Sequence, residues 1–256
     1  MPVQAQVPVR RYVEHVMGMP VSLALRGRHA DDDAAAMAWS AVMQSLREAD
    51  EVFSTYRTDS WISRLALGEV DLRSCPAEVA EVLALGERAR VESGGAFDVR
   101  RDSGAGPVLD PSGVVKGWAV QRAARVLGSL EATDHCLSAG GDMVCHVGTP
   151  GAEPWRIGIE DPRDPSRVVA VVPVRRGAVA TSGLAHRGAH IVDARNGQTP
   201  REVASVTVVA SDLTSADIDA TAAFALGPDA LTWLRTRQGR SGLVVWQDGR
   251  TDTFGG

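Results

Sequence analysis

The chain has 256 residues, of which 44% are hydrophobic and 23% charged, and its 27 Lys and Arg against 32 Asp and Glu give a net charge of −5. This is the composition of an ordinary globular protein, and an acidic balance without a basic stripe argues against nucleic-acid binding. Because no stretch is apolar enough to span a membrane and no signal peptide is visible, we expect a cytoplasmic protein. Three cysteines without a CxxC pair predict buried, reduced thiols at Cys75, Cys136 and Cys145.

The N-terminal half combines helices with one broken strand. Its predicted elements are, in chain order, a loose arm at 1–10, a strand at 12–25 broken near Gly18, a helix from 31 to about 50, a loop with a short helix at 53–65, a helix at 76–93 and a loop at 98–113. Acidic residues at 31–33 complement the dipole at the start of the first helix. Pro76 suits the start of the next helix, and Gly94 and Gly95 suit its end.

The C-terminal half is richer in strands. Its predicted elements are a helix at 116–130, a strand, Gly-Gly turn and strand within 136–148, strands at 155–162, 168–182, 189–197 and 205–211, a helix at 215–226, a helix from 228 to 239, and a closing hairpin at 243–254. The turn of that hairpin is expected at Asp248-Gly249. Helices occur in blocks rather than in strict alternation with strands, so we expect an α+β fold with a mainly antiparallel sheet.

The run SADIDATAAFALG at 215–227 offers ligands for a metal. Asp217 and Thr221 are four residues apart in a helical pattern, which puts a carboxylate and a hydroxyl on one face, one turn from each other. Both are hard oxygen ligands of the kind that Mg²⁺ prefers. A purely structural role, as a carboxylate near a helix start and a buried hydroxyl, is equally open at this point.

The run LDPSGVVKG at 109–117 offers a corner for a phosphate. It contains Asp110, a turn with glycine, and Lys116 at the start of the predicted helix, where an ammonium and free backbone N–H groups suit an anion. Lys116 is the only lysine of the chain, and all other basic residues are arginine. A merely solvated charge is therefore the weaker interpretation, and the two runs together suggest chemistry on a phosphate ester or anhydride.

Two further motifs are weak by themselves. The run AGGD at 139–142 is either a plain hairpin turn or a place where the backbone approaches a ligand closely, which glycine permits. His186 and His190 have the spacing of a zinc pair, but Gly188 between them and the lack of an HExxH glutamate disfavour zinc. His190 beside Asp193 could instead serve as a general base.

The order of the motifs carries a family resemblance. They run as MGMPVSLAL, FSTYRTDSWISRL, GGAFD, LDPSGVVKGWAV, SAGGDM, WRIGIEDP, ATSG, HIVDARNG and VTVVASDLTSADIDATAAFALG. This series resembles the ApbE-type FAD:protein FMN transferase family over about residues 13–227. The resemblance implies an ApbE-like fold, as a single domain over residues 1–256 with FAD in a central cleft.

The resemblance also implies an activity. FAD would bind with a divalent metal, usually Mg²⁺, at its pyrophosphate, and a threonine or serine hydroxyl of an acceptor protein would attack the FMN-side phosphorus while AMP leaves. Such phosphoryl transfer needs positioning and charge neutralisation, which the metal and Lys116 can supply. Two alternatives stay open: an FAD pyrophosphatase that uses water and gives FMN and AMP, and a protein that binds FAD without turnover.

Carried over position by position, the resemblance gives roles to residues of this chain. For the metal it implies Asp217, Thr221 and the carbonyl oxygen of Gly113, with Ala220 beside them. For FAD it implies Met17, Tyr56, Ala96, Phe97, Asp98, Asp110, Lys116 and Ile191, with Gly140, Gly141 and Asp142 shaping the floor of the pocket. For catalysis it implies Asp217 together with His190, the base that would deprotonate the acceptor hydroxyl.

The chain departs from the family pattern mainly on the side expected to face the acceptor. Met19 replaces the threonine of an M-G-T motif, Ala66 replaces an asparagine, and Gln121 replaces an aspartate. The short connection from Asp98 to Asp110 predicts a more open site, and the usual lipoprotein or export signal is not seen. The chain holds no convincing flavinylation motif, so the acceptor with its threonine or serine motif is expected to be another protein.

Overall fold

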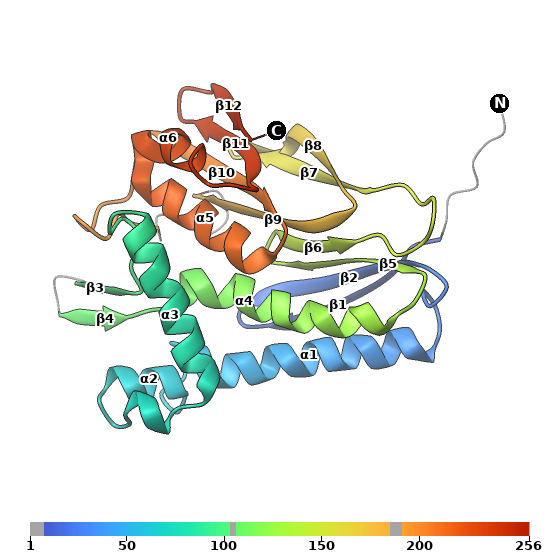
Figure 1. The fold of residues 1–256 in the computed structure, drawn as a ribbon, viewed down its shortest axis with the longest axis horizontal. Helices are drawn as coiled ribbons and strands as arrows, with labels where there is room; N and C mark the ends of the chain where they lie inside the picture. The colour runs from blue at the N-terminus through green and yellow to red at the C-terminus, as the bar shows by residue number, and fades with distance from the viewer. Residues whose placement is uncertain (1–7, 103–105, 185–190, 256) are drawn as a thin grey trace.

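The computed structural model describes residues 8–102, 106–184 and 191–255, and an eight-stranded sheet forms its centre. The strands of this sheet are β1 Arg10–Val16, β2 Met19–Gly27, β5 Thr133–Ala139, β6 Asp142–His146, β9 Arg176–Gly183, β10 Val203–Ala210, β11 Ser241–Trp246 and β12 Thr251–Phe254. They lie side by side in that order, and every neighbouring pair is antiparallel. The expected α+β class with a mainly antiparallel sheet is confirmed (Figure 1).

Helices cover one face of the sheet. They are α1 Asp33–Phe53, α2 Trp61–Ala66, α3 Ala77–Glu92, α4 Ser112–Ala124, α5 Leu213–Leu226 and α6 Ala230–Leu234, with short 3-10 turns η1 Leu72–Ser74, η2 Arg125–Ser129 and η3 Gly227–Asp229. Helices α1 and α4 run side by side along the sheet, whereas α5 packs on β9 and β10 and against α4 (Figure 1). The contact between α4 and α5 positions the candidate site.

The two helices that matter most are buried to different extents. In α1 the N-cap Asp32 accepts a hydrogen bond from the backbone of Ala35, and buried residues such as Val42 and Leu46 recur at helical spacing on one face. Helix α5 is buried nearly all round, as expected of a helix inside the protein. Asp217 is therefore a carboxylate in an apolar interior, with only 2% of its surface exposed.

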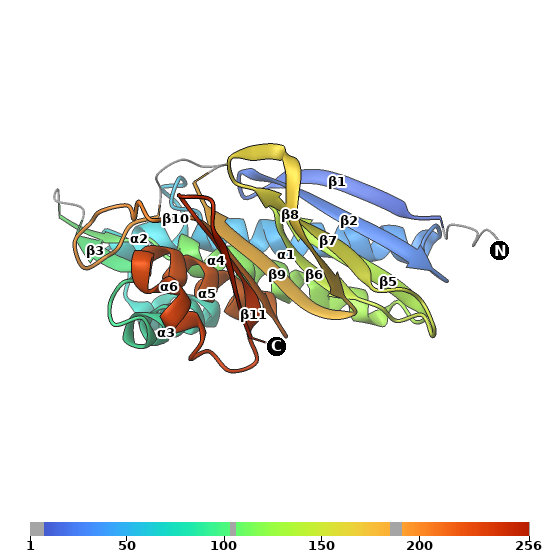
Figure 2. The same ribbon diagram turned by 90° about the horizontal axis from the view of Figure 1, so that it is seen from above.

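A separate hairpin covers the opposite face of the sheet. Strands β7 Trp155–Asp161 and β8 Asp164–Val174 pair with each other, and their apolar side chains close a second, smaller core against β6 and β9 (Figure 2). Ile157 and Ile159 point into this core, where they meet Cys145 and Val179 of the central sheet. The alternating pattern of WRIGIEDP reflects one buried and one exposed face of β7.

Several sequence expectations need correction. The loop expected at 98–113 contains a small hairpin, β3 Arg100–Asp102 with β4 Pro107–Leu109, and the first turn of α4. The strand expected at 168–182 is divided at Arg175 between β8 and β9, which belong to different sheets, because alternation alone does not show where a chain changes sheet. The helix expected at 228–239 is limited to η3 and α6.

The strand expected at 189–197 is wrong in its described part. Asp193 makes only an isolated bridge to Gln198, and its carboxylate accepts hydrogen bonds from the backbone and side chain of Arg195. Such local side-chain bonding favours a turn over a strand. Gly197 follows with a φ of +72°, as a turn glycine.

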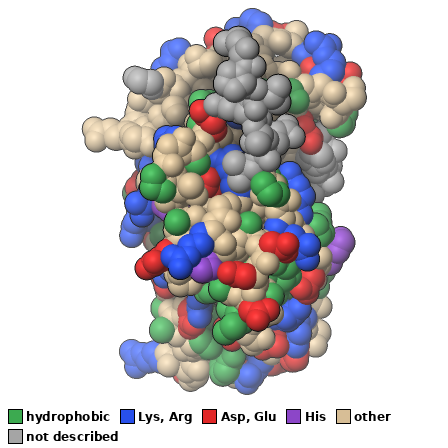
Figure 3. All heavy atoms as spheres, turned by 90° about the vertical axis from the view of Figure 1, so that its right-hand side faces the viewer, with side chains coloured by type: hydrophobic (Ala, Val, Ile, Leu, Met, Phe, Trp, Pro, Cys, Tyr) green, Lys and Arg blue, Asp and Glu red, His purple; other side chains and the backbone are tan. Residues whose placement is uncertain are grey.

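Three further observations concern the surface, the helices and the thiols. Acidic and basic side chains are interspersed on the face seen in Figure 3. No helix in the described part of the chain is long and apolar enough to cross a membrane.

All three cysteines are free thiols, but only Cys145 is buried, whereas Cys75 and Cys136 are half-buried, contrary to expectation.

Candidate active site

A cavity of about 1010 Å³ opens at the ends of the central strands. It is bounded by the β1–β2 turn, the Gly140-Gly141 turn between β5 and β6, the start of α4 and the middle of α5, and it continues under β7. Gly140 and Gly141 have φ angles of +56° and +93°, which match the two-residue hairpin turn that glycine favours. This turn brings backbone without side chains up to the cavity wall.

Lys116 joins three elements at the cavity wall. From the second turn of α4, its Nζ lies 2.5 Å from Oδ2 of Asp142 on β6 and 3.1 Å from Oδ1 of Asp217 on α5. The other oxygen of Asp142 accepts a hydrogen bond from the backbone N–H of Thr181 at 2.9 Å. The carboxylates are 1% and 2% exposed, while the Lys116 side chain keeps 19% of its surface accessible. The cluster is thus a buried acidic pair with one cation that reaches the cavity.

The burial of this cluster shifts its proton equilibria. Burial raises the pKa of Asp217 to about 7, against the opposing effect of Lys116 and in the same direction as the nearby charge of Asp142. Burial alone would lower the pKa of Lys116, but the two carboxylates outweigh it and raise that pKa above its ordinary value. Lys116 therefore stays charged, because its two carboxylate partners stabilise the positive charge of its amine.

The close contact of α4 and α5 depends on Gly117. A Cβ at this position would lie 2.7 Å from Cβ of Asp217 and 2.8 Å from the carbonyl oxygen of Leu213, so no larger residue fits. The Gly117 N–H donates a hydrogen bond to Oδ2 of Asp217 at 2.9 Å. One turn later, Gln121 accepts a hydrogen bond from the N–H of Leu213 at 2.7 Å, so this departure from the family pattern caps α5.

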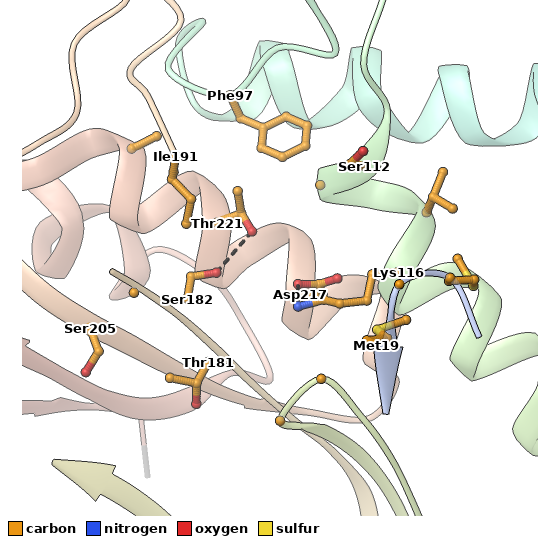
Figure 4. A pocket seen from close by; sticks show the side chains of 18 of the residues that line it. Met19, Phe97, Ser112, Lys116, Thr181, Ser182, Ile191, Ser205, Asp217 and Thr221 are labelled. Carbon is orange, nitrogen blue, oxygen red and sulfur yellow. Dashed lines mark hydrogen bonds and ion pairs between the residues drawn. The ribbon is translucent and has the colours of Figure 1, made fainter. Parts of the chain in front are cut away.

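Thr221 lies one turn after Asp217 on α5 and also faces the cavity (Figure 4). Its hydroxyl shares a hydrogen bond of 3.1 Å with the hydroxyl of Ser182 on β9. Across from it, a Cβ on Gly113 would lie 3.7 Å from the Thr221 methyl group and 2.9 Å from the Phe97 ring. Gly113, Thr221 and Asp217 therefore all line the same part of the cavity.

Most residues that the sequence assigns to the site line this cavity. These are Met17, Tyr56, Ala96, Phe97, Asp98, Asp110, Gly113, Lys116, Gly140, Gly141, Ile191, Asp217 and Thr221. Asp142 does not itself line the cavity but forms an ion pair with Lys116, which does. Tyr56 lies at the rim of the cavity, with 97% of its surface exposed. Ala220 is fully buried in the core and contributes packing rather than a cavity wall. His190 and His186 lie outside the described residues, so the roles suggested for them stay predictions.

Sequence reasoning missed one part of the cavity. Thr181 and Ser205, on neighbouring strands β9 and β10, line its lower part beneath β7. The hydroxyl of Thr181 shares a hydrogen bond of 2.9 Å with that of Thr207. The motif ATSG contains Thr181 and the motif WRIGIEDP forms β7, so both could have drawn attention to this region. Neither motif shows that β7 folds back over β9.

The fold and the site together define an α+β protein with a large ligand cavity and a buried lysine–carboxylate cluster between two helices. The family model of the ApbE family matches residues 17–103 and 100–244. The chain belongs to the ApbE family.

Its curated relatives share a common description. The chain is 28% identical over 151 residues to the FAD:protein FMN transferase of Klebsiella pneumoniae, covering 55% of this chain and 43% of that protein. The enzyme of the same name from Rhodobacter capsulatus is 32% identical over 159 residues, covering 58% and 30%. The chain thus spans less than half the length of the curated relatives it matches.

Solved structures support the fold. The ApbE protein of Thermotoga maritima superposes with a TM-score of 0.82 at 22% identity, covering 96% of this chain and 97% of that one. The flavinyl transferase ApbE of Pseudomonas stutzeri, in its apo form, gives a TM-score of 0.79 at 22% identity, covering 99% and 97%. The expected ApbE-like fold is confirmed.

Proposed function

We propose that this chain transfers the FMN part of FAD to a threonine or serine hydroxyl of an acceptor protein and releases AMP. The observation that carries the proposal is the buried cluster of Lys116, Asp142 and Asp217 beside the Thr221 hydroxyl at one end of a large cavity. The names of the curated relatives support the same activity. Because the lining residues run from the β1–β2 turn to α5, we further propose that one domain carries the whole site.

The residues of the cavity corner fit a magnesium ion by the chemistry of their donor atoms. Mg²⁺ usually takes one or two carboxylates together with substrate phosphates and water. Asp217 offers a carboxylate, Thr221 a hydroxyl and Gly113 a carbonyl oxygen. The described residues contain no cluster of three or more His, Cys, Asp or Glu side chains that could hold a metal, so substrate oxygens would complete the ligand set. When bound, the ion would neutralise charge on the pyrophosphate.

The residues of the chain would then divide the work. Lys116 would hold a phosphate oxygen with its protonated amine, because phosphoryl transfer builds up charge on the oxygens around phosphorus. Asp142, fixed by the Thr181 N–H, would keep Lys116 oriented while Asp217 turns to the metal. Phe97 and Ile191 would give apolar surface to the flavin ring. These roles all lie on the side of the site that binds FAD.

In the proposed reaction the acceptor hydroxyl is the nucleophile, and one bond to phosphorus forms while another breaks. Its hydroxyl oxygen forms a bond to the FMN-side phosphorus, the bond from that phosphorus to the bridging oxygen breaks, and AMP leaves with the electron pair. The hydroxyl proton passes to a base, for which the sequence suggests His190. That assignment stays a prediction, since His190 lies outside the described residues.

The test is to incubate the purified protein with FAD, Mg²⁺ and a threonine-bearing acceptor domain, and to measure AMP, free FMN and a covalent FMN adduct by mass spectrometry. We expect an adduct that EDTA suppresses. AMP and free FMN without an adduct, whichever acceptor is supplied, would instead make the chain an FAD pyrophosphatase. Intact bound FAD without products would make it a flavin-binding protein.

A further inference from the structure

Two of the three thiols face each other across the β5–β6 hairpin. Cys136 on β5 is the direct partner of Cys145 on β6, and their sulfur atoms lie 3.6 Å apart, with Cys145 donating to Cys136. Both are free thiols, whereas Cys75 lies elsewhere, at the end of η1. The pair is outside the lysine–carboxylate cluster, and the proposed transfer reaction makes no use of it.

The register of the hairpin places the pair where a cross-strand bond fits. Opposed residues of an antiparallel ladder alternate between hydrogen-bonded pairs and closer, non-hydrogen-bonded pairs. Ala139 and Asp142 close the two-residue turn as a hydrogen-bonded pair, so alternation makes Cys136 and Cys145 a non-hydrogen-bonded one. In such pairs the Cα atoms are about 4.5 Å apart, within the range that a disulfide spans.

The two sulfur atoms differ in how accessible they are and in the groups around them. Cys145 is 1% exposed and packs in the small core beneath the β7–β8 hairpin. Cys136 is half-buried and is the more accessible of the two. The hydrogen bond from Cys145 and the charge of Arg11 favour the thiolate of Cys136 and lower its pKa, against the effect of its burial. Cys136 is thus placed to react first, with Cys145 beside it to complete the exchange.

We propose that Cys136 and Cys145 are a redox-active pair that forms an intramolecular disulfide by exchange with a low-molecular-weight disulfide. The Cys136 thiolate attacks one sulfur of the small disulfide, whose S–S bond breaks and releases one thiolate. Cys145, losing its proton, then attacks the Cys136 sulfur and expels the second small thiolate. The protein is oxidised by two electrons, the small disulfide is reduced to two thiols, and the sulfur count balances.

The bond would tie down the part of the hairpin that lines the cavity. The loop it closes comprises residues 137–144, which include the Gly140-Gly141 turn and Asp142. Asp142 forms an ion pair with Lys116. A disulfide between Cys136 and Cys145 would therefore restrict the motion of Asp142 and, through it, the motion of the Lys116 amine. The exchange itself involves no flavin, so its test is independent of the proposed transferase function.

The experiment uses the Cys75→Ser variant, in which the pair holds the two remaining thiols. The folded protein is equilibrated in glutathione buffers from fully reduced to fully oxidised, alkylated, and examined by intact mass and peptide mapping. We expect both thiols to become protected together, with the loss of two hydrogen masses and a cross-linked peptide containing Cys136 and Cys145. The oxidised form should also unfold at a higher temperature than the reduced form.

A second variant tests the order of the steps. Cys145→Ser on the same background should stop at a glutathione adduct on Cys136, which in the parent protein does not accumulate. Two results would overturn the proposal: alkylation of both thiols at every buffer ratio, or an adduct on Cys136 that persists while Cys145 is intact. The chain with all three cysteines, mapped by peptides, repeats the measurement without any substitution.

Discussion

The amine of Lys116 lies 3.1 Å from a carboxylate oxygen of Asp217, in a helix that is buried nearly all round. Two buried carboxylates and one lysine leave a local excess of negative charge, since Asp142 pairs with the same amine. Such an excess costs free energy in the interior unless a cation offsets it. A divalent cation bound there would offset this excess when both carboxylates are ionised, in keeping with the metal-dependent reaction that we propose.

Replacing Lys116 by methionine should show how far the protein depends on this cation. The substitution keeps the length of the side chain but leaves Asp142 and Asp217 without their partner, and we expect the free energy of unfolding to fall by about 3 kcal/mol. Urea unfolding measures the loss, and Mg²⁺ should recover part of it. Arg47→Met, which removes an exposed ion pair with Glu14, is the matched control and should cost less than about 1 kcal/mol. Equal losses in the two variants would contradict the account.

The contact between α4 and α5 can be tested at Gly117. Because a methyl group there would lie 2.7 Å from Asp217 Cβ, Gly117→Ala should push the helices apart and lower stability by about 2 kcal/mol. Gly128→Ala is the control, since no atom lies within 4 Å of the added carbon. Thermal unfolding should separate the two. A stable Gly117→Ala variant with an intact Mg²⁺ response would show that the close approach of the helices is dispensable.

Thr221 should contribute its oxygen rather than its shape. Thr221→Val keeps the branched side chain but removes the hydroxyl that binds Ser182 and faces the cavity, and we expect the Mg²⁺ concentration for half-maximal activity to rise about 10-fold or more. Thr221→Ser should retain most of the affinity, and Thr253→Val, at an exposed position of β12, should change nothing. If valine and serine behave alike at position 221, the hydroxyl is not a ligand.

His135 should contribute to the pH dependence of the free energy of unfolding. Burial, with a smaller effect from His146, lowers its pKa from 6.5 to about 4, so the folded protein keeps the ring neutral where the unfolded chain binds a proton. The contribution of His135 to stability is then complete above about pH 6.5 and is lost as the pH drops toward 4, by up to about 3 kcal/mol. His135→Gln should flatten this part of the profile in urea unfolding. Parallel profiles of the two proteins would rule out this origin.

The sequence predicts those parts of the fold that depend on local patterns. The helical spacing of Asp217 and Thr221 is found in α5, and the Gly140-Gly141 turn lies between two strands as expected. Local patterns failed where tertiary pairing decides. Nothing in the apolar run at 168–182 marks Arg175 as the point where the chain passes from one sheet to another.

The same division applies to the site. Because Lys116 is the only lysine, the sequence predicts a role in phosphate binding, and this role stays a prediction although the side chain lines the cavity. The sequence did not show that Asp142 and Asp217 share its amine. Asp142 comes from β6, Lys116 from α4 and Asp217 from α5, and their meeting depends on the packing of α4 against α5. The glycine that allows this packing, Gly117, has no distinctive local pattern.

The most direct test of the central claim is the rate of AMP release from FAD with Mg²⁺ and an acceptor domain, compared between the wild-type protein and Asp217→Asn. Asparagine keeps the size and a hydrogen-bond acceptor for Gly117 but removes the charge. We predict that release falls by about 100-fold or more while FAD binding weakens much less. A variant that releases AMP at the wild-type rate and with the same Mg²⁺ dependence would contradict the assignment of Asp217 to the metal.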